Sequence, residues 1–180
     1  MKKCVSIMLV LLLMLSASVT GISAAEKDYA ATGDDSYTVS GTITSYLSDE
    51  DDVIIAIKGS GQLSLSVKKK GNNIAIKYNN IPAGKYTVSI SKNNHVTREY
   101  EINLNSDYNL DAVICPLGDV NMDGKITTMD VTRANAHVKG TAPLKGYQLL
   151  LADAAPDSEG VTTMDVTRIN AHAKEVNFLW

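Results

Sequence analysis

The sequence predicts an α+β protein of two domains, in which an antiparallel β-sandwich of about seven strands is followed by a small all-α domain. Two observations lead to this fold class. Residues 36–115 consist mainly of short segments in which apolar and polar residues alternate. Residues 116–180 carry helix-forming sequence in which one stretch occurs twice. Strands and helices are therefore expected in separate parts of the chain.

The N-terminal residues 1–25 have the pattern of a secretory signal peptide. Lys2 and Lys3 precede an apolar run, and residues 23–25 are small, as a cleavage site requires. The run is short and contains serines, which is typical of a leader, although an uncleaved anchor is the alternative. We therefore expect a secreted protein, extracellular or at the cell surface, with no stable membrane insertion after cleavage. Residues 26–35 would form a flexible mature N-terminus.

Net charge and cysteine content argue against a nucleic-acid-binding protein and against a disulfide-bonded one. The formal net charge is -3, and phosphate binding needs clustered Lys and Arg, so we expect no nucleic-acid partner. Residues 68–70 are the only basic run, and they stand beside a Gly-Asn-Asn turn. Cleavage of the leader removes Cys4 and leaves Cys115 alone, so no internal disulfide can form. Cys115 is expected to be a small buried apolar residue rather than a nucleophile.

Strand patterns follow one another through the first domain. They occupy residues 37–44, 53–57, 62–67, 74–78, 86–90, 96–104 and 108–114. Turn signals separate them, among them the acidic stretch 49–52 and the Ile-Pro-Ala-Gly stretch 81–84. The Gly-Asn-Asn turn at 71–73 predicts a hairpin between the strands on either side of it.

The second domain is built on an internal repeat. Residues 127–133 return at 162–168, an offset of 35 residues, and an Asn-Ala-His triplet returns with the same offset. Such fidelity indicates one supersecondary unit used twice. Each copy predicts a helix after its Asp, and Gly140 would end the first helix. Residues 144–152 predict a third, connecting helix.

A D-x-N-x-D-G loop with EF-hand spacing opens the first repeat at residues 119–130. Calcium takes about six to eight oxygen ligands, and alternate residues of a tightly turned loop can supply them. Gly124 would permit the sharp turn. The predicted ligands are Asp119, Asn121, Asp123, the carbonyl of Lys125, Thr127 directly or through water, and Asp130. The alternative is a polar surface turn without metal.

The second loop, residues 153–165, is a degenerate copy that is one residue longer. Its candidate oxygen donors are Asp153, Asp157, Glu159 and Asp165. The sequence leaves open whether these residues bind a second calcium ion or whether the loop only keeps its shape. The cofactor prediction is therefore Ca²⁺ at one site, with a second site undecided.

Residues 116–180 resemble a dockerin domain in length, repeat order and the Asp at each loop end. The resemblance implies a non-catalytic protein that docks through calcium onto the cohesin module of a scaffold or cell-surface protein, in association with polysaccharide degradation. It also implies that the partner is read at the loop ends and along the helices. These residues are Thr128, Met129, Arg133 and Asn135, with Thr163, Met164, Arg168 and Asn170 in the second copy. Packing between the helices is the alternative for Met129 and Met164.

Two histidines and two aromatic residues of this domain also carry expectations. His137 and His172 are expected on the helix surfaces without a metal role. Phe178 and Trp180 would either clasp the domain start near Pro116 or simply pack as an apolar tail.

The first domain, residues 36–115, resembles a carboxypeptidase regulatory-like or transthyretin-like module, on the stretches 81–88 and 92–99. That resemblance implies a spacer or interaction domain. Three other functions are open. A glycoside hydrolase would need paired carboxylates such as Glu99 and Glu101, which strand exposure also explains. A carbohydrate-binding module, and so a polysaccharide partner, would use an aromatic platform of Tyr46, Tyr78, Tyr86 and Tyr100. A calcium sensor would open a hydrophobic groove.

Overall fold

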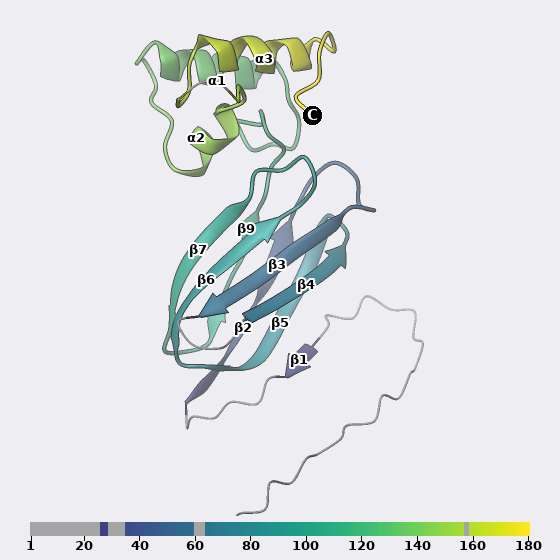
Figure 1. Ribbon diagram of the computed structural model, residues 1–180, viewed down its shortest axis with the longest axis vertical. Helices are drawn as coiled ribbons and strands as arrows, with labels where there is room; N and C mark the ends of the chain where they lie inside the picture. The colour runs from purple at the N-terminus through teal and green to yellow at the C-terminus, as the bar shows by residue number, and fades with distance from the viewer. Residues whose placement is uncertain (1–25, 29–34, 60–63, 157–158) are drawn as a thin grey trace, which may run out of the picture.

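The computed structural model describes residues 26–28, 35–59, 64–156 and 159–180. The predicted signal peptide at 1–25 and most of the predicted flexible N-terminus lie outside these residues. Figure 1 shows a two-layered β-structure with the helices gathered at one of its ends. None of the helices in the described ranges is long and apolar enough to cross a membrane.

The described residues form nine strands and three helices. The strands are β1 (Glu26–Asp28), β2 (Ser36–Thr44), β3 (Asp52–Gly59), β4 (Ser64–Lys70), β5 (Asn73–Pro82), β6 (Gly84–Ser91), β7 (Arg98–Leu104), β8 (Tyr108–Asn109) and β9 (Ala112–Val113). The helices are α1 (Thr128–Val138), α2 (Tyr147–Ala152) and α3 (Thr163–Ala173). The α+β class is thus confirmed, with strands first and helices after them.

The two sheets differ in strand direction. One sheet has the order β4-β3-β6-β7 and is antiparallel throughout. In the other, of order β1-β5-β2-β8, β2 is antiparallel to β5 but parallel to β8 and β9, and β1 is parallel to β5. The prediction of a wholly antiparallel sandwich is therefore wrong for this sheet. The chain reaches β8 and β9 by crossing over from β7 in the opposite sheet, so it does not double back on a neighbouring strand.

The predicted hairpin at residues 71–73 is also wrong. β4 pairs with β3 and β5 pairs with β2, so this turn carries the chain from one sheet to the other. β4 and β5 both bury alternate side chains. This alternation is the same whether the two strands pair in one sheet or lie in two facing sheets, so it could not distinguish the two arrangements. Gly71, with φ of 122°, makes the change of direction.

A single apolar core lies between the sheets. Alternate residues of each strand enter it, as in β3, where Val53, Ile55 and Ile57 are buried. Apolar burial of this kind is the main driving force for folding. The core residues are Val39, Ile43, Val53, Ile55, Ile57, Leu65, Ile74, Ile76, Tyr78, Ile81, Tyr86, Val88, Ile90, Ile102, Leu104, Leu110, Ala112 and Ile114.

The C-terminal unit, residues 116–180, has a smaller core of its own. Helices α1 and α3 lie side by side with α2 beside them (Figure 1). Val120, Ala134, Leu144, Ala152, Ala154 and Ile169 are buried together in this unit. The predicted connecting helix exists but begins later, at Tyr147. Gly140 has a φ of 71° just beyond α1, which agrees with its predicted role as a helix stop.

Candidate metal centre

The first loop, residues 119–130, is wrapped around the carboxylate of Asp119. Its Oδ1 accepts a hydrogen bond from the Asp123 amide at 3.1 Å, and its Oδ2 accepts one from the Gly124 amide at 2.8 Å. Two residues in left-handed conformations bend the chain there, Met122 with φ of 65° and Gly124 with φ of 87°. The sharp turn expected at Gly124 is present.

Asp130 joins the loop to helix α1. Its Oδ1 accepts from the Asn121 amide at 2.9 Å, and its Oδ2 accepts from the Thr127 amide at 2.8 Å. Thr127 is the N-cap of α1, and its side chain accepts from the Met129 amide in return. The position of the loop and the start of the helix therefore depend on one carboxylate.

The mouth of the loop holds the remaining polar groups. Asn121 donates through Nδ2 to Asp123 Oδ2 at 2.8 Å, and the Lys125 amide donates to Asp123 Oδ1 at 2.9 Å. Asp123 and Lys125 are exposed. Within the described residues, no three His, Cys, Asp or Glu side chains are gathered closely enough to form a metal cluster. The predicted site relies as much on amide, hydroxyl and backbone oxygens as on carboxylates.

The electrostatics of the loop favour a cation. Asp119 and Asp130 are both 0% exposed. Burial raises the pKa of Asp119; hydrogen bonds from the Gly124 and Asp123 amides lower it, and repulsion by the Asp130 and Asp123 carboxylates raises it again. A buried carboxylate without a compensating charge is costly. The donor set contains only oxygens, which hard cations such as Ca²⁺ prefer, so the residues fit the predicted ion.

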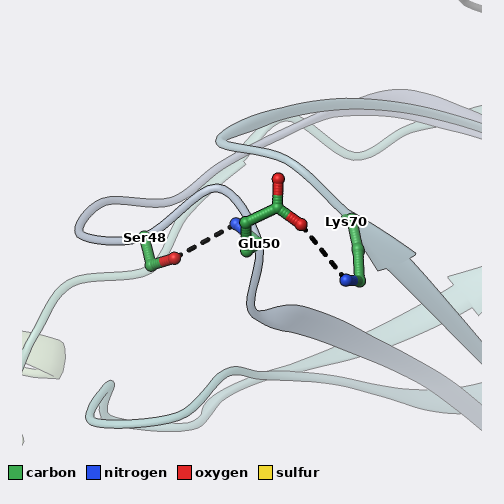
Figure 2. Close-up of polar contacts among 3 residues, drawn as sticks. All are labelled: Ser48, Glu50 and Lys70. Atoms are coloured by element: carbon green, nitrogen blue, oxygen red, sulfur yellow. Dashed lines mark hydrogen bonds and ion pairs between the residues drawn. The ribbon is translucent and has the colours of Figure 1, made fainter.

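The only salt bridge among the described residues involves neither Asp119 nor Asp130. Lys70 Nζ lies 3.2 Å from Glu50 Oε2, and the Glu50 amide donates to Ser48 Oγ at 3.1 Å (Figure 2). The Lys70 and Glu50 side chains are 62% and 81% exposed. A pair this exposed contributes about 0–1 kcal/mol. In the described part of the chain, Asp119 and Asp130 thus have no salt-bridge partner.

The second loop places Asp165 as the first loop places Asp130. Asp165 is 0% exposed, caps α3 with Thr162, and accepts from the Ala154 and Ala155 amides at 2.7 and 2.6 Å. Burial alone would raise its pKa, but hydrogen bonds from Thr162, Ala155 and Ala154 outweigh burial and lower it. Asp153 and Glu159 are exposed, and Asp157 lies outside the described residues.

The predicted docking residues lie on both repeats. Met129 and Met164 are 59% and 57% exposed, so neither is packed between the helices. Thr128, Arg133 and Thr163 are also exposed, whereas Asn135, Arg168 and Asn170 are half-buried.

The two repeat histidines have a role that the sequence analysis missed. His137 Nδ1 accepts from the Leu144 amide at 3.0 Å, and His172 Nδ1 accepts from the Leu179 amide at 3.2 Å. Each histidine therefore anchors the segment that returns along its helix. The sequence contained a sign of this role, because the 35-residue offset that relates His137 to His172 also relates Leu144 to Leu179.

The C-terminal tail closes over the start of its unit through Leu179. A Cβ built on Gly118 would lie 2.6 Å from Leu179 Cδ1, so the leucine covers this glycine. Phe178 and Trp180 contact the ring of His172 at centroid distances of 5.5 and 4.7 Å. The contact with the domain start that was predicted for Phe178 and Trp180 is made instead by Leu179, which stands between them in the sequence. Alternate side chains point to opposite sides, so Phe178 and Trp180 contact His172.

The four tyrosines of the carbohydrate-binding alternative lie in separate surroundings. Tyr78 and Tyr86 are buried, Tyr46 is half-buried against Gly124, and Tyr100 is half-buried beside Arg98, so the four tyrosines form no open platform.

The candidate acid and nucleophile residues are unremarkable in their surroundings. Glu99 and Glu101 are exposed on β7. Burial, followed by the charge of Asp119, raises the pKa of Cys115 to about 12, so this thiol stays protonated.

No protein-family model matches this chain, and no curated protein matches it. Among solved structures, the chain is similar to two interface mutants of a type II cohesin–X-dockerin complex from Acetivibrio cellulolyticus. Identities are 21% and 20%, with TM-scores of 0.34 for both, over 76% of this chain and 94% of each of those chains. A candidate carbohydrate-binding protein from Bacteroides uniformis is 17% identical, with a TM-score of 0.35, over 45% of this chain and 42% of that chain. TM-scores this low do not establish a shared fold.

Proposed function

We propose that residues 116–180 act as a calcium-dependent dockerin, which attaches a secreted, non-catalytic protein to a cohesin module of a scaffold or cell-surface protein. The observation that carries the proposal is the pair of fully buried carboxylates, Asp119 and Asp130, in one loop of oxygen donors. Without a cation these two groups repel one another inside the protein. Bound calcium would neutralise them.

The connection from metal to docking surface runs through Asp130. This residue holds Asn121 in the loop and Thr127 at the start of α1. Relief of the repulsion on Asp130 therefore favours the folded start of the helix. The exposed Thr128 and Met129 are the first two residues of that helix, so their placement depends on the same carboxylate.

Matched residues at the starts of the two helices offer two similar docking surfaces. Thr163 and Met164 begin α3 just as Thr128 and Met129 begin α1, with the same capping residues before them. Exposed methionines at matched positions suit an adaptable apolar contact with a partner. Either surface could therefore face a cohesin.

The calcium step is tested by calorimetric titration of the metal-stripped full chain, with circular dichroism alongside. We expect at least one binding event with a gain of helix in the wild type. We expect neither event when Asp119→Ala is combined with Asp123→Ala, while the sandwich stays folded. Calcium at about a hundredfold above its Kd would stabilise the fold by about 2.7 kcal/mol.

Glu50→Ala is the matched control, because it also removes an acidic group but at an exposed ion pair. It should leave calcium binding and helix content unchanged. Full helicity of the Asp119→Ala, Asp123→Ala chain in the absence of calcium would contradict the metal-dependent fold.

Docking is tested against a panel of immobilised cohesin modules, with calcium and then with a chelator. We expect Met129→Asp alone to leave binding largely intact, because Met164 presents the second surface. Met129→Asp combined with Met164→Asp should abolish it. Binding that persists with the chelator would argue against calcium-dependent docking.

A further inference from the structure

A tyrosine of the sandwich lies against the first loop. Tyr46 follows β2, and a Cβ built on Gly124 would lie 2.3 Å from its Cδ1, so the ring rests directly on this glycine. The Tyr46 hydroxyl is 3.5 Å from the carbonyl oxygen of Met122. Gly124 and Met122 are the two left-handed residues that bend the loop. The ring therefore contacts the backbone that sets the curvature of the predicted calcium site.

The backbone of Tyr46 is held from both sides by the segment after β6. Lys92 Nζ donates to the Tyr46 carbonyl at 2.8 Å, and His95 Nε2 accepts from the Tyr46 amide at 3.3 Å. Lys92 is 5% exposed and also donates to Ser45 Oγ and Asn72 Oδ1 at 3.1 and 3.0 Å. Because a buried cation with three oxygen partners is firmly placed, the ring is supported by a rigid part of the sandwich.

We propose that Tyr46 is a positioning residue for calcium, through which the sandwich holds the first loop in its binding conformation. The inference rests on the proposed function, since it concerns the same loop. A loop fixed before binding loses less conformational freedom when the ion arrives, so its affinity is higher. By reciprocity, calcium strengthens the attachment of the C-terminal unit to the sandwich by the same free energy.

The test is calorimetric calcium titration of the full chain carrying Tyr46→Ala. We expect the Kd of the first loop to rise about tenfold, equivalent to about 1.4 kcal/mol. Leu47→Ala is the matched control, since it shortens the exposed neighbouring side chain and leaves Tyr46 in place. Tyr46→Leu, which keeps apolar bulk, is a second variant expected to weaken binding less. The calcium-induced rise in Tm should be smaller in both Tyr46 variants than in Leu47→Ala.

A double-mutant cycle with Gly124→Ala tests the contact itself. In the wild type, the new methyl group meets both a left-handed φ and the Tyr46 ring. In the Tyr46→Ala background only the backbone strain is left, so the loss of calcium affinity should be several-fold smaller. Equal losses in the two backgrounds would show that the ring does not control the loop.

The outcomes separate this inference from the function on which it rests. A wild-type chain that binds no calcium would overturn both. Normal calcium binding in the wild type, with an unchanged Kd in Tyr46→Ala and Tyr46→Leu, would overturn only the positioning role of Tyr46.

Discussion

Asp130 and Asp165 occupy the same position in the two repeats but have different neighbours. Each caps its helix together with the threonine three residues before it. Asp165 also accepts two short hydrogen bonds from the Ala154 and Ala155 amides, where Asp130 accepts from Asn121. Burial raises the pKa of Asp165, but hydrogen bonds from Thr162 and from the Ala155 and Ala154 amides outweigh burial and lower it. We therefore expect the second loop to depend less on calcium than the first.

The tail contact of His172 predicts a pH-dependent change near the C-terminus. Burial lowers the pKa of His172, whose Nδ1 must be unprotonated to accept from the Leu179 amide. Its contribution to stability is therefore complete above the unfolded pKa of about 6.5 and is lost as pH falls through the lower folded value. Trp180, the only tryptophan in the chain, lies against His172, so its fluorescence should change with a midpoint below about pH 6.5.

Two substitutions control this titration. His172→Gln should remove the fluorescence change, whereas His137→Gln should leave it in place. A midpoint at or above the ordinary value for histidine would contradict the proposed burial effect.

At the level of helices and strands, local sequence patterns predicted which segments form helices and strands, but not always which strands pair with each other. The repeat predicted both helices but placed each after its Asp, whereas α1 begins at Thr128 and α3 at Thr163, with Thr127 and Thr162 as N-caps. The segment 108–114 divides into β8 and β9. The Asp111 carboxylate between them accepts a hydrogen bond from the Thr42 amide of β2 at 2.8 Å, and Asp107 before them accepts one from the Thr38 amide at 2.8 Å. Such contacts join residues 69 positions apart, and no local pattern reveals them.

Helices α1 and α3 pack together through residues of different size at equivalent positions of the repeat. The repeat offset relates Ala134 to Ile169, and both are 0% exposed in the same small core. Because this core is small, the lost volume cannot be filled easily, and Ile169→Ala should lower the free energy of unfolding of the C-terminal unit by about 2–5 kcal/mol. Chemical denaturation followed by circular dichroism measures this loss.

Thr167→Ala is the control for that measurement, since Thr167 is exposed on the same helix. Its effect should stay within about 0.5 kcal/mol. Equal effects of the two substitutions would mean that Ile169 does not hold the helix pair together.

For the whole molecule, Tyr147 connects the helical unit to the sandwich. Its hydroxyl donates to the Val96 carbonyl at 2.6 Å and accepts from the Cys115 amide at 3.2 Å. Burial raises its pKa to about 12, so the donor proton is retained at neutral pH. The guanidinium of Arg98 lies 4.8 Å from the Tyr147 ring centroid. The sequence predicted strands followed by helices but contained no sign of this connection, which joins residues 51 positions apart.

We expect Tyr147→Phe to uncouple the two parts. The change leaves the Val96 carbonyl and the Cys115 amide without their partner, at a cost of about 1–3 kcal/mol. Calorimetric melting in calcium should then show the helical unit unfolding before the sandwich, with a wider separation than in the wild type. Tyr108→Phe, on the sandwich alone, should shift only the later transition. Unchanged separation in Tyr147→Phe would show that the junction is held by other contacts.

The lysines of β4 bear on how copies of the protein behave toward one another. β4 is an edge strand of its sheet, and Lys68, Lys69 and Lys70 end it. Lys69 folds back to donate to the Ala75 carbonyl at 2.8 Å, while Lys68 and Lys70 are exposed. An open edge can recruit a strand from a second molecule, and like charges brought together there repel. The basic run is therefore expected to disfavour pairing of this edge with the same edge of a second copy.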